Sequence, residues 1–221
     1  MLKIENFEVL GWEHAIRGMR NPMNSWEKSD SNFFDDSEGH VCNICQGRGS
    51  MSLIEIGPND YTLMKNLRNA GTDHRKFMRM ITVYLDITAP LYWLKEFDTY
   101  RVGVEKNSCS TMHKIHAKEF TLEDFSCEKL YDPLGDLRPI VDRLNVYRER
   151  YLETKDKNDW WQMIQLLPTS YNQKRTVMLN YEVLANIYKS RRHHRLDEWH
   201  TLCDWISELP YSELITGEEY E

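Results

Sequence analysis

Three neighbouring side chains with chemically active groups, Ser108, Cys109 and Ser110, stand near the middle of the chain. Hydroxyl groups and backbone N–H groups in so short a segment can form a turn that binds an anion. The same residues are also typical of an ordinary turn. We do not assign Cys109 as a nucleophile, because a reactive thiol needs a cationic neighbour and the sequence does not place one.

Basic residues near the N-terminus offer a second candidate site. Arg17, Arg20 and Asn24 lie between the apolar residues Trp12 and Trp26. A guanidinium group binds phosphate through two parallel hydrogen bonds. We therefore expect Arg20 to contact a phosphate-bearing ligand, so that Arg20→Ala lowers ligand affinity more than thermal stability. The basic run at residues 191–195 is interpreted as a solvated helix end rather than as a nucleic-acid site.

The cysteines offer the third candidate. Cys42 and Cys45 have the spacing of a metal-binding or redox pair, and His40 is the other candidate ligand nearby. A structural zinc site needs four ligands, so we interpret these as ordinary loop thiols and expect no metal site. The chain has five cysteines, and an odd number without an export signal is typical of reduced thiols in the cytoplasm.

Composition limits the partners. The 221 residues include 28 basic and 35 acidic side chains, which gives a net charge of −7. A general nucleic-acid binder or a protein of anionic membrane surfaces needs a basic face, so both classes are disfavoured. The sequence also has no apolar stretch long enough to span a membrane. A small anionic ligand stays possible, because a few local cations can hold one phosphate.

These residues must be positioned by a mixture of helices and strands. Alternating apolar residues predict strands at 2–10, 80–87 and 174–178. Capping and breaking residues predict helices at 59–71, 90–100, 139–155, 158–167, 180–192 and 196–209. Residues 17–50 and 117–135 are expected to be irregular. Because no regular strand–helix–strand repeat is visible, we predict an α+β fold with residues 1–221 in a single domain.

The segment at residues 74–114 resembles the flavin-dependent thymidylate synthases, also called thymidylate synthase complementing proteins. In that family a His precedes a strand, an Ala-Pro pair opens a helix, and the helix leads into the signature RHRxxSxNExSxR. Here Ala89-Pro90 takes the helix start. Of the signature, Arg101, Asn107 and Ser110 match, whereas Thr99, Tyr100, Val104, Ser108 and Met112 depart from it.

A second block resembles the same family near the C-terminus. The family has a Leu-Pro pair, an Arg, an Asn-x-Arg-x-x-x-Asn helix that ends in Leu-Arg, and a Trp in the last helix. The matching residues here are Leu167-Pro168, Lys174, Asn180, Glu182, Asn186, Arg191 and Trp199. By the resemblance, Lys174 replaces an Arg that meets the nucleotide, and Glu182 replaces an Arg that contacts flavin.

The resemblance implies FAD held in a homotetramer, dUMP placed against the flavin, and NADPH and methylenetetrahydrofolate as further reactants. It assigns His74, Arg101, Asn180 and Asn186 to the cofactor and Lys174 and Arg191 to the substrate. The local arguments add Arg20 and Ser108 to the substrate set, and Ser110 is the candidate catalytic residue. Some of these have simpler roles open to them: Asn180 can cap a helix, Arg191 can complement a helix C-terminus, and His74 can make a local hydrogen bond.

Three hypotheses of function follow. The first is a flavin-dependent thymidylate-synthase-like enzyme that acts on a pyrimidine nucleotide, dUMP or an analogue. The second is a non-catalytic nucleotide-binding or structural paralogue on the same scaffold. The third is a flavin reductase without folate chemistry. Glu182 bears on the choice, because a carboxylate buried beside a phosphate is costly unless it is paired.

Overall fold

The computed structural model describes residues 1–34 and 53–217. The chain divides into two compact units. Unit 1 contains Met1–Lys3, Ile87–Thr99 and Asn107–Thr176. Unit 2 contains the described residues of Ile4–Asp86, Tyr100–Lys106 and Val177–Glu221.

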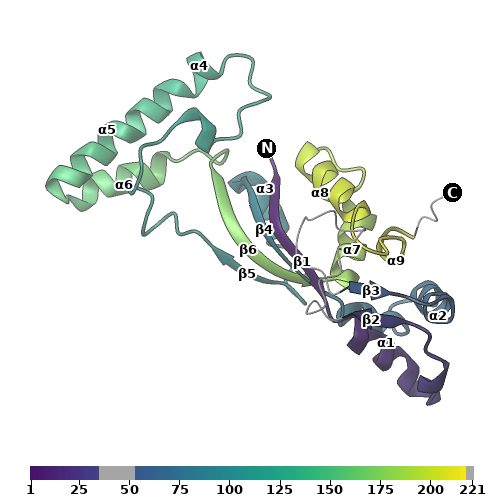
Figure 1. The fold of residues 1–221 in the computed structure, drawn as a ribbon. Coiled ribbons are helices and arrows are strands. Elements are labelled where there is room, and N and C mark those ends of the chain that lie inside the picture. Colours follow the sequence, from purple (N-terminus) through teal and green to yellow (C-terminus); the bar gives the residue numbers. More distant parts are fainter. Residues whose placement is uncertain (35–52, 218–221) are drawn as a thin grey trace. The chain divides into compact units, whose positions relative to one another are not determined.

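The main sheet has four strands in the order β1-β4-β6-β5, and its residues belong partly to each unit (Figure 1). The strands are β1 (Lys3–Leu10), β4 (Thr82–Pro90), β5 (Glu105–Ser108) and β6 (Asn172–Asn180). In β4, Val83, Leu85, Ile87 and Ala89 are buried and the residues between them are not, which is the period of two that a strand requires. The predicted α+β class, a sheet flanked by helices, is confirmed.

Two pairs of contacts fix strand directions. Leu91 follows β4, and its N–H donates to the carbonyl of Tyr171, which precedes β6. Tyr181 follows β6, and its N–H donates to the carbonyl of Ile81, which precedes β4. These bonds join opposite ends, so β4 and β6 are antiparallel. At β5 the N–H of Cys109 donates to the Lys174 carbonyl.

Unit 1 is built around a helical hairpin. It contains α3 (Leu91–Phe97), η5 (Leu122–Asp124), α4 (Pro133–Asp136), α5 (Arg138–Thr154) and α6 (Lys157–Leu166). Helix α5 ends at Lys155, which has a φ of 57°, and Asp156 caps α6 by accepting from the Asn158 N–H at 2.9 Å. The two helices pack against one another. They enclose an apolar core with the loop before them: Ile115, Phe120, Phe125, Leu137, Val141, Leu144 and Met163.

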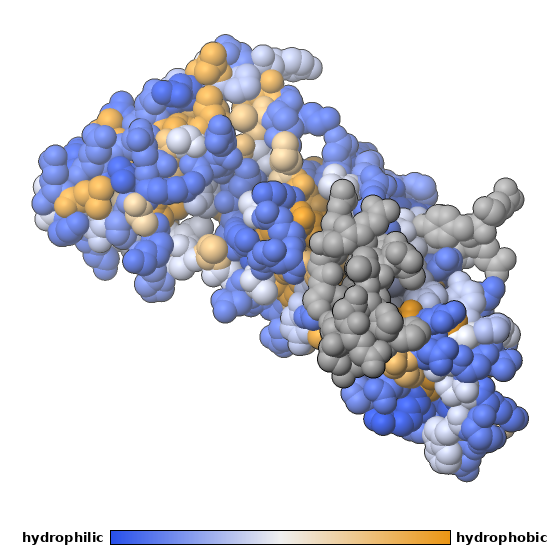
Figure 2. Space-filling model, in the orientation of Figure 1, coloured by the Kyte–Doolittle hydropathy of each residue, from blue (hydrophilic) through white to orange (hydrophobic). Residues whose placement is uncertain are grey.

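The surface of these helices is not uniformly polar. Apolar side chains on or just before α4, α5 and α6 are exposed, among them Leu130, Leu134, Val146, Leu152 and Trp161. Figure 2 shows hydrophobic patches over this helical part, set among hydrophilic residues. In the described residues, no helix combines the length and apolar character needed to cross a membrane.

Unit 2 contains most of the remaining helices. They are α1 (Trp12–Arg20), η1 (Asn21–Met23), η2 (Trp26–Lys28), α2 (Pro58–Asn69), η4 (Arg75–Arg79), α7 (Tyr181–Arg191), α8 (Asp197–Ser207) and α9 (Glu213–Thr216). A small antiparallel pair, β2 (Asn32–Phe34) and β3 (Leu53–Glu55), completes it. Tyr181 is fully buried, packs edge-on against Trp12 at 5.2 Å between ring centroids, and donates its hydroxyl to the Pro210 carbonyl.

Three sequence expectations need correction. Residues 17–20, expected to be irregular, finish helix α1, because Trp12, Ala15, Ile16 and Met19 form one buried helical face. The rest of the 17–50 segment contains η1, η2 and β2, and residues 35–50, with Cys42 and Cys45, lie outside the described residues. The segment 117–135 contains η5 and the start of α4. Strand β5 was missed, since its residues are polar and it forms by pairing with β6.

Candidate functional site

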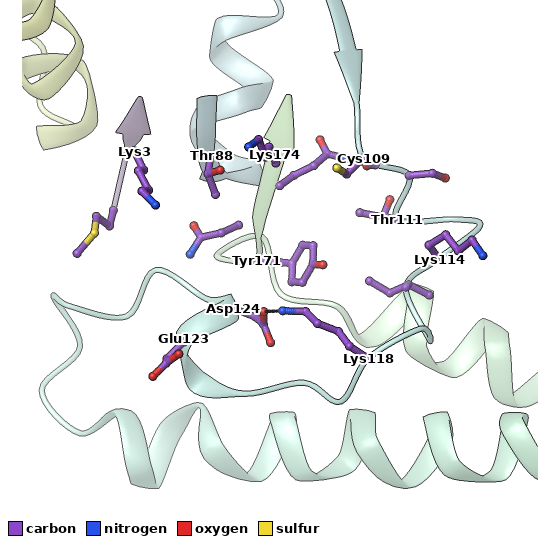
Figure 3. A pocket seen from close by; sticks show the side chains of 15 residues that line it. Lys3, Thr88, Cys109, Thr111, Lys114, Lys118, Glu123, Asp124, Tyr171 and Lys174 are labelled. Atoms are coloured by element: carbon purple, nitrogen blue, oxygen red, sulfur yellow. Dashed lines mark hydrogen bonds and ion pairs between the residues drawn. The ribbon is translucent and has the colours of Figure 1, made fainter. Parts of the chain in front are cut away.

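Unit 1 contains a cavity of about 640 Å³ whose wall carries four lysines. Lys3 comes from β1, Lys174 comes from β6, and Lys114 and Lys118 come from the loop that follows β5. Figure 3 shows them around the cavity, with Lys3 and Lys114 on opposite sides. The parts of all three segments that line the cavity belong to unit 1, so this cavity is a property of one compact unit.

The charge of the cavity is positive in a chain that is acidic overall. Two carboxylates, Glu123 and Asp124, face the four lysines. Lys118 and Asp124 form an ion pair. The hydrogen bond to Asp124 raises the pKa of Lys118, and it outweighs the opposite effect of burial. The side chains of the wall therefore carry more positive than negative charge, which suits an anionic ligand.

Backbone and side-chain hydrogen bonds fix the loop at the mouth of the cavity. The Gln173 amide donates to the Cys109 carbonyl at 2.7 Å, and the Cys109 N–H donates to the Lys174 carbonyl at 2.9 Å. Next to them, the Ser110 hydroxyl accepts from the N–H groups of Met112 at 3.2 Å and His113 at 3.0 Å. It also lies 2.8 Å from Nδ1 of His113. The loop is thus a tight turn that presents Cys109, Ser110 and Thr111 to the cavity.

The structure brings two of the predicted residues together here. Ser110 and Lys174 both line the cavity. Ser108, the last residue of β5, is exposed and is not part of the cavity wall. Tyr171 forms part of the wall, and burial raises the pKa of its hydroxyl. That group therefore stays neutral at physiological pH and adds no negative charge.

The residues assigned to the cofactor all lie in unit 2, where contacts join the segments that carry them. Arg75, the neighbour of His74, contacts α7 twice: its Nε lies 2.8 Å from Oε2 of Glu182, and its Nη2 donates to Oδ1 of Asn186 at 3.3 Å. His74 itself is exposed. The loop before β5 also reaches α7, because the Tyr100 hydroxyl lies 3.0 Å from the Ser190 hydroxyl.

Asn180 has a structural role at the start of α7. Its side chain caps α7 by accepting from the Val183 N–H at 3.0 Å, as one of the open alternatives predicted. Gly103, with a φ of 73°, lies against it, and a Cβ at residue 103 would sit 2.9 Å from the Asn180 amide nitrogen. Arg101 is exposed and lies two residues before this contact.

Arg191 is held by aromatic rings in unit 2. Its guanidinium lies 4.6 Å from the Trp199 ring centroid and 5.7 Å from that of Tyr100, and its Nε donates to the Tyr100 hydroxyl at 3.0 Å. A guanidinium stacked in this way is pre-organised, with less side-chain entropy to lose when it binds an anion. It also lies in the last turn of α7, where a cation complements the helix dipole.

Arg20 has a different environment from the one expected. The side chain is buried, and its Nε lies 2.6 Å from Oδ1 of the fully buried Asp60. Its other two nitrogens donate to the carbonyls of Ser25 at 3.2 Å and Lys28 at 3.0 Å. Every nitrogen of the guanidinium has a partner inside unit 2, so Arg20 connects α1, the following turns and α2.

Sequence reasoning missed Lys3, Lys114, Lys118 and Arg75. Lys114 and Lys118 come from one loop and Lys3 from a strand distant in sequence, and no motif marks the three as a set. Arg75 directly follows His74, which was assigned to the cofactor. A basic residue beside that position is the feature of the sequence that could have indicated Arg75. Among the described residues, no group of three or more His, Cys, Asp or Glu side chains has the arrangement of a metal site.

Comparison with solved structures identifies the fold. Two structures of thymidylate synthase X (ThyX) from Helicobacter pylori with FAD and dUMP match this chain with TM-scores of 0.69 and 0.66. Both are 17% identical, and the matches cover 98% and 97% of this chain and 97% of theirs. The chain has the ThyX fold. A UMP/dUMP methylase, PolB from Streptomyces cacaoi bound with 5-Br dUMP, also matches, with a TM-score of 0.58, 13% identity and coverage of 98% and 95%.

The similarity to ThyX is one of structure. No protein-family model matches the sequence, and no curated protein matches it. At these identities the comparison shows the fold and leaves the ligands of this chain to be argued from its own residues.

Proposed function

We propose that this protein binds a pyrimidine nucleotide, dUMP or an analogue, with the phosphate in the lysine cavity of unit 1. The observation that carries the proposal is the concentration of Lys3, Lys114, Lys118 and Lys174 on one cavity of an acidic chain. The fold adds support, because ThyX structures were solved with dUMP and PolB with a bromo analogue. Lysine ammonium groups are common phosphate ligands.

We also propose that unit 2 binds FAD, which would make the protein a ThyX-like nucleotide methylase. The donor groups there suit a dinucleotide: two guanidinium groups, Arg75 and Arg101, and the amide of Asn186. The Glu182 carboxylate is 7% exposed and would repel a diphosphate if it were unpaired. Arg75 compensates its charge at 2.8 Å, so the charge conflict expected from the sequence is offset within the site.

The chemistry divides between the cofactor and the chain. When bound, FAD supplies hydride transfer, with NADPH as the reductant and methylenetetrahydrofolate as the methylene source by analogy with the family. The chain's own task is to bind and orient. We propose that Lys174 and the turn at Cys109–Thr111 hold the phosphate and that the Ser110 side chain, which lines the same cavity, contacts the nucleotide. Arg191, which the resemblance assigns to the substrate, lies in unit 2 and is a separate candidate for contact with an anionic ligand there.

Nucleotide binding is tested by isothermal titration of the purified full chain with dUMP. Lys174→Ala should weaken dUMP binding about tenfold, because a hydrogen bond to a charged group is lost. Lys95→Ala is the matched control, since Lys95 is an exposed lysine of unit 1 on α3 that does not line the cavity. Equal affinities for the two variants, or no dUMP binding by the parent protein, would contradict the proposal.

Flavin binding has its own test. Protein that carries FAD absorbs near 450 nm, and addition of NADPH bleaches that band in an active flavoprotein. Methyl transfer to dUMP that depends on methylenetetrahydrofolate then distinguishes a methylase from a flavin reductase. Protein that binds dUMP but is colourless after incubation with FAD supports instead the non-catalytic nucleotide-binding function. That second candidate is favoured by the loss of most of the RHR triplet, of which only Arg101 is present.

Assembly and location belong to the same proposal. By the resemblance to the ThyX family we propose a homotetramer in the cytoplasm, with no nucleic-acid partner and no membrane attachment. Light scattering coupled to gel filtration gives the mass in solution, and a monomeric mass at micromolar concentration would rule out the tetramer.

A further inference from the structure

We infer that Tyr171 and Asn172 determine which base the lysine cavity accepts, by donating hydrogen bonds to the oxygen at C4 of a uracil ring. The inference deepens the proposed function and rests on it, because it assumes that this cavity of unit 1 is the nucleotide site. Both residues line the cavity, and neither is among the motif positions that carry the family resemblance.

The side-chain amide of Asn172 is held in one orientation. Its Oδ1 accepts from the Ser126 hydroxyl at 2.8 Å, so the NH₂ group occupies the other arm of the amide. Among the residues that the structure describes, this NH₂ group has no acceptor, and Asn172 is only half-buried. Asn172 therefore offers N–H donors to a ligand in the cavity, while its oxygen is already hydrogen-bonded.

The Tyr171 hydroxyl is a second donor on the same wall. The ring is fixed edge-on against Phe125 and Phe120, at 5.6 and 6.4 Å between centroids. Figure 3 shows the ring in the cavity, with Asp124 and Lys118 below it. Within the described part of the chain the hydroxyl has no hydrogen-bond partner. Burial raises the pKa of this hydroxyl, so it keeps its proton at neutral pH.

Two neutral donors side by side select a ligand by its acceptors. A carbonyl oxygen has two lone pairs and accepts two hydrogen bonds. The oxopyrimidines carry such an oxygen at C4, where cytosine carries an amino group that donates. Against cytosine, the Asn172 NH₂ group would face another donor, and a polar group left unpaired in a half-buried site is costly. The phosphate is common to both nucleotides, so the difference in affinity comes from the base.

The first experiment compares dUMP with dCMP by isothermal titration of the full chain. We expect dUMP to bind at least about tenfold more tightly. Asn172→Asp replaces the NH₂ group with an oxygen that accepts from the cytosine amino group, and the carboxylate still accepts from Ser126. The ratio of dUMP affinity to dCMP affinity should therefore fall at least about tenfold. Asn158→Asp, at an exposed position of α6 in unit 1, adds the same charge and should leave the ratio unchanged.

A second variant tests the hydroxyl. Tyr171→Phe keeps the ring and its packing and removes only the O–H group. We expect dUMP affinity to fall about tenfold, while the affinity for 2-deoxyribose 5-phosphate, which has no base, stays unchanged. Tyr131→Phe is the matched control, because Tyr131 is a fully exposed tyrosine of unit 1. Circular dichroism melts check that each variant is folded. If Asn172→Asp does not fold, the parent's preference and Tyr171→Phe still decide the matter.

The outcomes separate this inference from the proposed function. If the parent binds dCMP at least as tightly as dUMP, or if folded Asn172→Asp keeps the parent's ratio, the inference is overturned and the nucleotide site stands. The same holds if Tyr171→Phe weakens 2-deoxyribose 5-phosphate as much as it weakens dUMP. If neither nucleotide binds the parent protein, the proposed function fails, and the inference fails with it.

Discussion

Arg75 and Glu182 form an ion pair in which Nε lies 2.8 Å from Oε2, with side-chain exposures of 17% and 9%. The pair joins η4 to α7 at the place where the family resemblance puts an Arg on the helix. In this chain the cation of the contact comes from η4 and the anion from α7. The net charge of this contact is therefore zero.

Breaking this pair should be costly for stability. Arg75→Ala leaves the Glu182 carboxylate buried without its cation, and we expect a loss of about 3 kcal/mol in the free energy of unfolding. The double variant R75A/E182Q should lose less than the sum of the two single variants, because neither charge is then left alone. Urea unfolding followed by circular dichroism measures all three. Additive losses would show that the two residues do not interact.

Asp60 should make stability depend on pH. Burial alone would raise the pKa of this carboxyl, but hydrogen bonds from Ser29, Ser31 and Arg20 outweigh burial and hold the pKa below its usual value. A carboxyl with a lowered pKa in the folded state contributes stability above its unfolded pKa, about 3.9, and loses it as pH falls further. Unfolding free energies measured between pH 6 and pH 3 should therefore fall below about pH 4.

Two substitutions of aspartate test whether Asp60 causes this pH dependence. Asp60→Asn should be less stable at pH 7 by about 3 kcal/mol, because Arg20 loses its buried partner, and its stability should change less between pH 5 and pH 3. Asp73→Asn, at an exposed position of unit 2, should keep the parent's pH dependence. The same network implies that Arg20→Ala acts mainly on stability.

Gly103 should tolerate no side chain. Its φ of 73° favours glycine, and a Cβ would meet the Asn180 amide, which caps α7. We expect Gly103→Ala to cost about 2 kcal/mol, from the backbone conformation and from disturbance of the cap. Gly71→Ala is a matched control: its φ is 102°, but a Cβ there meets nothing within 4 Å. A smaller loss for Gly71→Ala, seen in thermal melts, would isolate the contribution of the cap.

The thiols should report occupancy of the cavity. Cys109 is exposed on the cavity wall, whereas Cys203 is buried. Burial raises the pKa of the Cys203 thiol to about 11, so it stays protonated at pH 8. We expect iodoacetamide at pH 8 to alkylate Cys109 and spare Cys203, with peptide mapping by mass spectrometry. A bound nucleotide should slow the labelling of Cys109, and an unchanged rate at saturating nucleotide would count against ligand binding in this cavity.

Much of the fold could be predicted from local pattern. The period of two in residues 82–89, Pro139 at the start of α5 and the caps Asp156 and Asn180 before α6 and α7 mark these elements, and the structure has them within a few residues. Strand β5 could not be found in this way, because Glu105, Lys106, Asn107 and Ser108 have no apolar face and form a strand only by pairing with β6. Helix α1 follows the left-handed Gly11, and its last turn is rich in Arg, which hides the helical spacing of its apolar residues.

Only the cavity residues that lie within a recognisable motif were among the predicted site residues. Ser110 and Lys174 lie at positions of the family pattern, and both line the cavity. Lys3 and Lys114 belong to segments with no pattern in common, so only the three-dimensional structure places them on one wall. Arg20 was expected to bind ligand because its segment offers Arg side chains in place of those missing from the signature, and the sequence contains nothing that pairs it with Asp60.

The cap on α7 changes how matches between distant chains should be interpreted. Asn180 holds the first turn of the helix through the Val183 N–H, whether or not a cofactor is bound. Substitution at this position is therefore restricted to residues that can also cap, chiefly Ser, Thr and Asp. An asparagine at this position therefore meets the structural requirement of a helix start whether or not it also contacts a ligand. Asn180→Asp separates the two, since the cap persists while the amide donor is removed.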